Sequence, residues 1–240
     1  MASRSLEQLL ARQQALQRIA ASSPELGGRI QELRTWQAAR LARTYADLRA
    51  TPQYSCAVEF FLSDIYGPHD FTRRDRDLAR AASQLRRALP RALLEILCAA
   101  LELDVLSTEL DQQMASRLTT ALTEPFYGVI YRAVGRPADR QRQINLVCET
   151  GAALNALVAH PWVGLALRAA HLPAHLAGLG ALQDFLERGW AAFRSLRTGD
   201  RLLEEIRRRE TALMDALFQD RGNPFASDAV AIGGSGPHAS

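Results

Sequence analysis

Apolar residues recur at helical spacing in one segment of this chain after another, and proline or glycine stands at most of the breaks. Leu6, Leu9, Leu10 and Leu16, for example, fall on one face when 3.6 residues make a turn. No stretch alternates apolar and polar residues as a strand does, and no Asn-Gly turn joins two apolar runs. The pattern therefore predicts an all-α fold.

The breaks divide the chain into about nine to eleven helices, and the short turns between them place neighbours antiparallel in a bundle. Most starts are marked by proline at the first helical position, or by Ser, Thr or Asp as a cap. Gly27-Gly28 weakens the start of the second helix and moves it to Arg29. Helices are expected at residues 4–21, 29–50, 52–67, 72–88, 90–101, 107–122, 125–135, 137–160, 161–172, 173–199 and 201–219.

The chain of 240 residues is long enough to bury a stable core without disulfides or metals. It contains no long linker and no repeat of about 20–50 residues, which argues against a solenoid. The sequence predicts one compact domain over residues 1–221. Residues 222–240 include a Gly-Gly-Ser-Gly run and are expected to form a disordered tail.

All 29 basic residues are arginine, but the net charge is only +3, too little to indicate nucleic-acid binding by itself. The densest group is seven arginines in residues 70–91, offset by three aspartates. Arg73, Arg76 and Arg80 could form a stripe for phosphates, yet no aromatic residue interleaves with it. We expect weak nucleic-acid binding that moderate salt abolishes, and a solvated helix face is the alternative.

Cys56, Cys98 and Cys148 are isolated, without a Cys-x-x-Cys pair, which favours a reducing compartment. The first residues carry no apolar signal core, and no stretch approaches 18 uncharged apolar residues. We therefore expect no membrane span and a cytoplasmic location.

Residues 59–71 are the most distinctive segment, with four aromatic residues, three carboxylates and one histidine around a Gly-Pro pair. Adjacent Phe60 and Phe61 lie about 100° apart on a helix, so they can face different neighbours. Gly67-Pro68 should end that helix sharply. The segment predicts a fixed elbow that binds a ligand or partner. Alternatively, its acids cap the next helix or pair with Arg73, Arg74 or Arg76. The candidate binding residues are Glu59, Phe61, Asp64, Tyr66, Asp70 and Arg73.

Residues 60–66 read Phe-Phe-Leu-Ser-Asp-Ile-Tyr. This stretch resembles the FFLEELY motif that names a bacterial family, and it departs from the motif at Ser63, Asp64 and Ile65. Asp64 keeps a carboxylate at the second acidic position. The resemblance extends over about residues 5–220. It implies a helical bacterial protein without an established activity, and it transfers no catalytic residue.

His160, His171 and His175 are the candidate ligands for a metal or haem. His171 and His175 have the i, i+4 spacing of helical metal ligands. However, Pro173 lies between them and is expected to start a helix, so the two rings need not share a face. There is neither an H-E-x-x-H motif nor a Glu-x-x-His pair. The sequence thus predicts no metal site.

No P-loop, glycine-rich dinucleotide loop or G-x-S-x-G elbow is present, so nucleotide chemistry of the common kinds is not expected. The leading hypothesis is a binding or regulatory module for a partner protein or an apolar small molecule. The alternative is a haem-oxygenase-like or di-metal helical enzyme or cofactor binder. It would use His171 or His175 with a carboxylate from residues 59–70 or Glu149. The sequence indicates neither a particular cofactor nor an oligomeric state.

Overall fold

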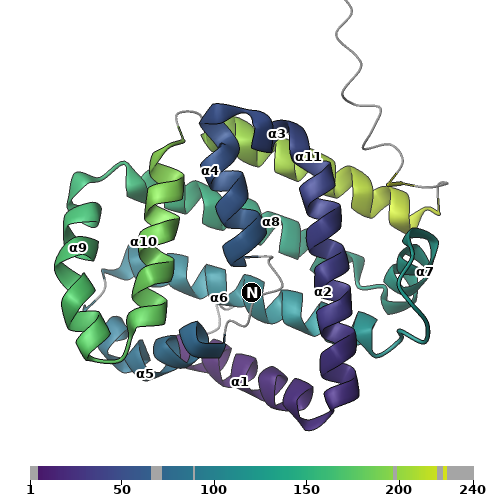
Figure 1. Ribbon diagram of the computed structural model, residues 1–240, viewed down its shortest axis with the longest axis horizontal. Coiled ribbons are helices and arrows are strands. Elements are labelled where there is room, and N and C mark those ends of the chain that lie inside the picture. The colour runs from purple at the N-terminus through teal and green to yellow at the C-terminus, as the bar shows by residue number, and fades with distance from the viewer. Residues whose placement is uncertain (1–4, 66–71, 89, 197–198, 221–223, 226–240) are drawn as a thin grey trace, which may run out of the picture.

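The computed structural model describes residues 5–65, 72–88, 90–196, 199–220 and 224–225 (Figure 1). These residues contain eleven α-helices and no strand, and helix accounts for 87% of the structure. The helices pack into a compact bundle, which confirms the predicted all-α class and the predicted number of helices.

The helices follow one another through short connections. Their bounds are α1 Leu6–Ser22, α2 Pro24–Thr44, α3 Ala46–Ala50, α4 Pro52–Phe60, α5 Thr72–Ala88, α6 Arg91–Ala115, α7 Glu124–Val134, α8 Pro137–Val158, α9 Pro161–Leu176, α10 Gly180–Arg194 and α11 Gly199–Phe218. A single π-helical turn, Phe61–Ile65, continues α4.

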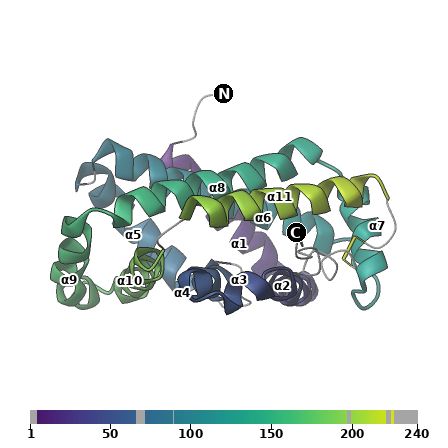
Figure 2. The same ribbon diagram turned by 90° about the horizontal axis from the view of Figure 1, so that it is seen from above.

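Helix α6 lies at the centre of the bundle and contacts α1, α2, α7 and α8. Helices α8 and α11 pack against each other on one side, and α2, α4 and α10 lie on the opposite side (Figure 2). The hairpin of α9 and α10 forms one end of the molecule and α7 the other (Figure 1). A site on the α9–α10 hairpin would therefore be separate from a site near α7.

Local signals account for many helix starts. The Ser5 side chain accepts from the Gln8 N–H, and the Gln8 side chain accepts from the Ser5 N–H, which makes a capping box at α1. Ser23 and Thr123 cap α2 and α7 through their hydroxyls. Proline in the first turn fixes φ near −65° without wasting a hydrogen bond, since that N–H has no partner inside the helix.

The core is made mostly of leucine. Leu33, Leu110 and Leu146 are fully buried, on α2, α6 and α8 respectively. Each such side chain contributes roughly 1.5–3 kcal/mol relative to an exposed one. Phe225 is also buried, against Trp36 and Tyr127, although residues 222–240 were expected to form a tail.

Two predicted boundaries are wrong. Helix α2 begins at Pro24 rather than Arg29, because the Gly27 N–H bonds the Ser23 carbonyl and the glycines are tolerated inside the helix. Residues 91–115 form one helix instead of two. Ser107 does not cap a helix there, since its hydroxyl accepts a hydrogen bond from Gln143 of α8 at 2.8 Å.

A third correction concerns Pro173, which was expected to open a helix. It lies inside α9, one turn before the end. The missing N–H removes one hydrogen bond of the last turn, but the helix continues to Leu176. His171 and His175 therefore stand on the same continuous helix.

No single described helix is long and apolar enough to cross a membrane. Helices α8 and α9 meet the length and hydropathy criteria only when taken together, and they are bent by 89° at the break between them.

Candidate functional site: an interior polar cavity

A cavity of about 80 Å³ lies among α2, α7, α8 and α11. Its wall is unusual for the interior of a helical bundle because several long polar side chains face it. These are Arg40, Tyr45, Tyr127, Tyr131, Arg140 and Glu210. Two arginines and one glutamate leave a net charge of +1 on this wall.

Arg40 and Glu210 form a bidentate ion pair across the cavity wall. The two terminal nitrogens of Arg40 lie 2.6 and 3.1 Å from the two carboxylate oxygens of Glu210. The Tyr45 hydroxyl donates a third hydrogen bond to the same carboxylate at 2.8 Å. Burial disfavours the charged form of Arg40, but the Glu210 carboxylate outweighs that effect and raises the Arg40 pKa. Arg40 therefore stays charged.

Arg209 lies outside the cavity and supports the part of its wall that contains Tyr45. Its guanidinium donates to both carboxylate oxygens of Asp47, to the Thr44 carbonyl and to Glu205, and it lies 5.7 Å from the Tyr45 ring centroid. These contacts tie the ends of α2 and α3 to α11. Tyr45 is thereby fixed against Glu210.

We expect the ion pairs of Glu205 with Arg208 and Arg209, outside the cavity, to make the free energy of unfolding depend on pH. Hydrogen bonds from Arg208 and Arg209 lower the pKa of Glu205 from 4.5 to about 2. A lowered pKa in the folded state stabilises the protein above pH 4.5, and the contribution disappears as the pH falls towards 2. Glu205→Gln should therefore destabilise the protein at pH 7 and have a smaller effect at pH 3. Urea unfolding at both pH values measures the difference, and equal effects would contradict the expectation.

Arg140 is the second buried arginine, with 4% of its surface exposed. Its guanidinium lies 4.4 Å from the Tyr131 ring centroid, and its other contacts are a 3.4 Å bond to Gln143 and the Met114 sulfur at 3.0 Å. Among the described residues, no carboxylate lies within 4.0 Å of it, and its Nε has no acceptor. A buried cation thus lines the cavity without a counter-ion.

The position of Arg140 in its helix further favours the binding of an anion beside its guanidinium. It is the fourth residue of α8, close to the positive end of the helix dipole. Arg136, the N-cap residue, adopts a left-handed conformation and offers no side-chain cap. The backbone dipole and the Arg140 side chain both contribute positive charge to this corner of the cavity, whereas Asp139 of the same turn pairs with Arg136 at 2.6 Å.

The binding residues predicted from residues 59–73 do not gather at one place. Phe61 is half-buried and lines the cavity. Glu59 is exposed and pairs with Arg49 at 2.7 Å. Asp64 bonds Ser63 and Arg188, at 2.7 and 2.8 Å. Arg73 is exposed on α5.

Tyr66, Asp70 and the Gly67-Pro68 stop lie outside the described residues. Glu59 and Asp64 do form ion pairs, as the alternative reading expected, but with Arg49 and Arg188 rather than with the arginines of α5. Phe61 is therefore the one predicted residue that the described structure connects to the cavity.

Three of the six arginines of α5 pair with acidic residues. Arg74 binds Asp75, and Arg80 binds Asp77 and the Gly178 carbonyl. Arg86 lies 3.2 Å from Glu7 of α1. Of the arginines in the predicted phosphate-binding stripe, Arg80 is paired in this way, and Arg73 and Arg76 are exposed.

The histidines have partners different from those that the enzyme hypothesis used. Glu149 binds Arg142. His171 and His175 instead lie against Glu187 and Asp184, both of α10, at 2.9 Å in each case. This cluster is at the opposite end of the molecule from α7 and is separate from the cavity (Figure 1).

A protein-family model described as "Domain of unknown function (DUF8198)" matches residues 16–224. The chain belongs to this family. The match covers Arg40, Arg140 and Glu210 of the cavity and the whole α9–α10 hairpin. Among curated proteins and among solved structures, nothing matches the chain.

Proposed function

We propose that this DUF8198 protein is a binding module for a small organic anion, which occupies the interior cavity. The observation that carries the proposal is Arg140, a guanidinium that is 4% exposed and faces the cavity without a carboxylate partner among the described residues.

An isolated charge in a protein interior costs several kcal/mol, so buried cations are normally paired. Stacking on Tyr131 offsets part of this cost, because a desolvated cation over an aromatic face gains about 2 kcal/mol or more. A carboxylate in the cavity would supply the rest through charge-assisted hydrogen bonds from the Arg140 guanidinium. The same group could accept from Arg40, whose Nε is also buried without an acceptor.

The tyrosines add neutral donors to this site. Burial raises the pKa of Tyr45 and Tyr131, and the Glu210 carboxylate raises the Tyr45 pKa further. Both remain phenols at neutral pH. The Tyr45 hydroxyl already donates to Glu210, so Tyr131 is the one of the two that can donate to an oxyanion. The net charge of +1 on the wall and the Tyr131 hydroxyl favour an anionic ligand over a cationic one.

The volume limits the ligand to a small molecule. A space of about 80 Å³ is several times the roughly 10–15 Å³ that one water molecule needs. A short-chain carboxylate has comparable bulk. Phe61, Leu41 and Val147 in the wall would accommodate its apolar part.

This proposal refines the sequence-based hypothesis of a module for a partner protein or an apolar molecule. The polar wall replaces the apolar ligand by an amphipathic anion, and Phe61 links the cavity to the segment first singled out. We likewise propose that the chain is related to the FFLEELY family and that it comes from a bacterium. The free thiols of Cys56, Cys98 and Cys148 support the proposed cytoplasmic location.

The direct test is calorimetric titration of the protein with formate, acetate, propionate and lactate. Arg140→Met keeps most of the length of the side chain and removes its charge. Hydrogen bonds to charged groups contribute about 1.5–3 kcal/mol, so affinity should fall by roughly 10- to 150-fold. Arg201→Met, on the exposed side of α11, is the matched control and should bind as the wild type does.

Stability without ligand provides the second readout. Because Arg140 has no counter-ion, Arg140→Met should leave the ligand-free melting temperature unchanged or raise it. Unchanged affinity in Arg140→Met, or no binding of any of the four anions at 10 mM, would refute the proposal.

A further inference from the structure

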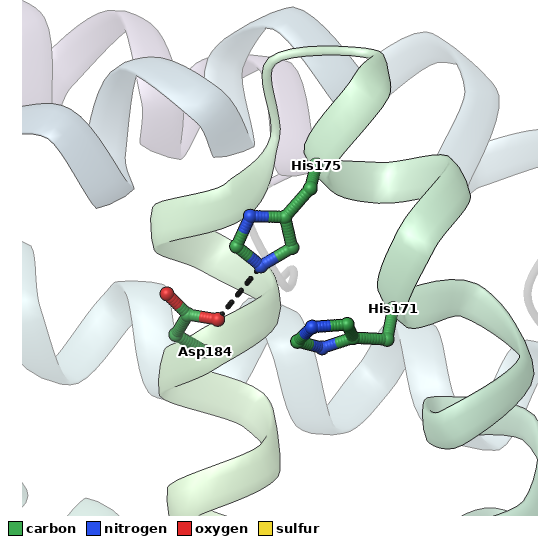
Figure 3. Close-up of side chains that lie close together, drawn as sticks. All are labelled: His171, His175 and Asp184. Atoms are coloured by element: carbon green, nitrogen blue, oxygen red, sulfur yellow. Dashed lines mark hydrogen bonds and ion pairs between the residues drawn. The ribbon is translucent and has the colours of Figure 1, made fainter.

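We propose that the α9–α10 hairpin is a binding site for a divalent transition-metal ion, with His171, His175 and Asp184 as ligands. Figure 3 shows the two imidazoles, one turn apart on α9, beside the carboxylate of α10. One metal-binding atom from each of the three residues lies within 4.8 Å of the other two. The ring centroids of the two histidines are 4.6 Å apart.

The continuity of α9 is what creates the site. Two residues at i and i+4 share a helix face, which is the spacing of helical zinc-binding histidines. The sequence argument against a metal assumed that Pro173 breaks the helix between them, and that assumption is wrong. The remaining ligand could not be assigned from spacing, since it comes from the next helix.

The turn between the helices fixes Asp184 opposite the histidines. Leu179 N–H bonds the Ala174 carbonyl and Gly178 N–H bonds the His175 carbonyl, which is the Schellman arrangement. Gly178 has φ 72°, a left-handed conformation that favours glycine. Arg80 of α5 donates to the Gly178 carbonyl and clamps the turn to the bundle.

Two further glycines let the helices and the imidazole approach. A Cβ at position 164 would lie 2.3 Å from the Trp190 ring, so only glycine permits this contact between α9 and α10. A Cβ at position 180 would lie 2.7 Å from Nδ1 of His175. Gly180 thus leaves the space that the His175 ring occupies beside Asp184.

The surroundings orient His171 as a metal ligand needs. Its Nδ1 lies 2.9 Å from Glu187, which leaves Nε2 for an ion. Gln183, only 5% exposed, donates to Glu187 at 2.8 Å and to the Leu167 carbonyl at 2.7 Å. A carboxylate behind a metal-bound histidine fixes its tautomer and ring plane. Glu187 and Gln183 are therefore positioning residues for this site.

The ligand set indicates the class of metal. Two imidazoles and one carboxylate suit Zn²⁺, Co²⁺, Ni²⁺ or Cu²⁺ better than the oxygen-seeking Mg²⁺ and Ca²⁺. Ligand atoms about 2.0–2.1 Å from a tetrahedral zinc lie roughly 3.3 Å apart. His175 Nε2 and Asp184 Oδ1 are at 2.9 Å already, and the half-exposed side chain of His171 has room to move inward. Water would complete the coordination.

The test is titration of the full-length, untagged protein with Zn²⁺ by calorimetry, and with Co²⁺ by visible absorption. We expect one ion per chain and Co²⁺ bands typical of nitrogen and oxygen ligands. His175→Ala and Asp184→Asn should each weaken Zn²⁺ binding at least 10-fold, and Glu187→Gln by about 10- to 100-fold. All of these side chains are partly exposed, so circular dichroism should show unchanged helix content.

His160→Ala is the matched control, since His160 is an exposed histidine at the N-cap of the same helix. Its Zn²⁺ affinity should equal that of the wild type. Cys56→Ser, which removes the exposed thiol, should also have no effect. The site assignment is overturned if Zn²⁺ does not bind saturably, or if the double variant His171→Ala, His175→Ala binds Zn²⁺ as the wild type does. Neither outcome bears on anion binding in the cavity.

Discussion

Phe60→Ala should lower the free energy of unfolding by about 3–5 kcal/mol, the range for removing a fully buried aromatic ring. Phe60 is 6% exposed, and its ring centroid lies 5.4 and 6.3 Å from those of Phe185 and Phe193. A Cβ at Gly189 would be only 3.0 Å from the same ring. The ring therefore fills the space between α4 and α10, and a cavity would remain after truncation.

Phe61→Ala is the matched comparison. Phe61 is half-buried and packs against a different cluster, beside the interior cavity. It should cost clearly less stability than Phe60→Ala and should change anion affinity, whereas Phe60→Ala should not. Urea unfolding followed by circular dichroism measures both costs. A larger loss for Phe61→Ala would mean that the assignment of the two rings is reversed.

These two phenylalanines show what helical periodicity can and cannot predict. Their separation by about 100° correctly indicates that they face different neighbours. It does not indicate which ring is fully buried, because that depends on Gly189 of α10, far along the chain. For this reason the sequence alone could not assign the larger truncation cost to Phe60, which the structure shows to be the buried ring.

The predicted helix boundaries are wrong where tertiary contacts override a local sequence signal. Ser107 has the character of a cap, but its hydroxyl accepts from Gln143 and α6 continues past it. Pro173 normally ends a helix, yet one further turn remains and the Schellman turn follows at Gly178. A cap or a breaker contributes about 1–3 kcal/mol, which packing of a whole helix face can outweigh.

The cavity could not be predicted because its residues come from helices that are distant in sequence. Arg40 and Glu210 are separated by 170 positions, and nothing in their local sequence links them. Arginine is also the chain's only type of cationic side chain apart from histidine, so the few buried arginines are hidden among many exposed ones. The i, i+4 pair Tyr127 and Tyr131, on an amphipathic helix, was the one available local signal.

Glu210→Leu, in contrast to a surface charge change, should lower the free energy of unfolding by about 3 kcal/mol. Breaking a buried ion pair costs roughly 3–5 kcal/mol, since the remaining charge stays uncompensated. The low end applies because the Glu210 side chain keeps 19% exposure, against 9% for Arg40. The Tyr45 hydroxyl also loses its acceptor in this variant.

The double variant Arg40→Met, Glu210→Leu separates charge from packing. Replacing both partners by apolar residues of similar volume removes the isolated charge, so stability should return to within about 1 kcal/mol of the wild type. Glu25→Leu at the exposed Arg29–Glu25 pair is the control and should cost less than about 1 kcal/mol. Chemical unfolding of the single and double variants gives the coupling energy. If the double variant is as unstable as the two single losses added together, Arg40 and Glu210 are not a coupled buried pair.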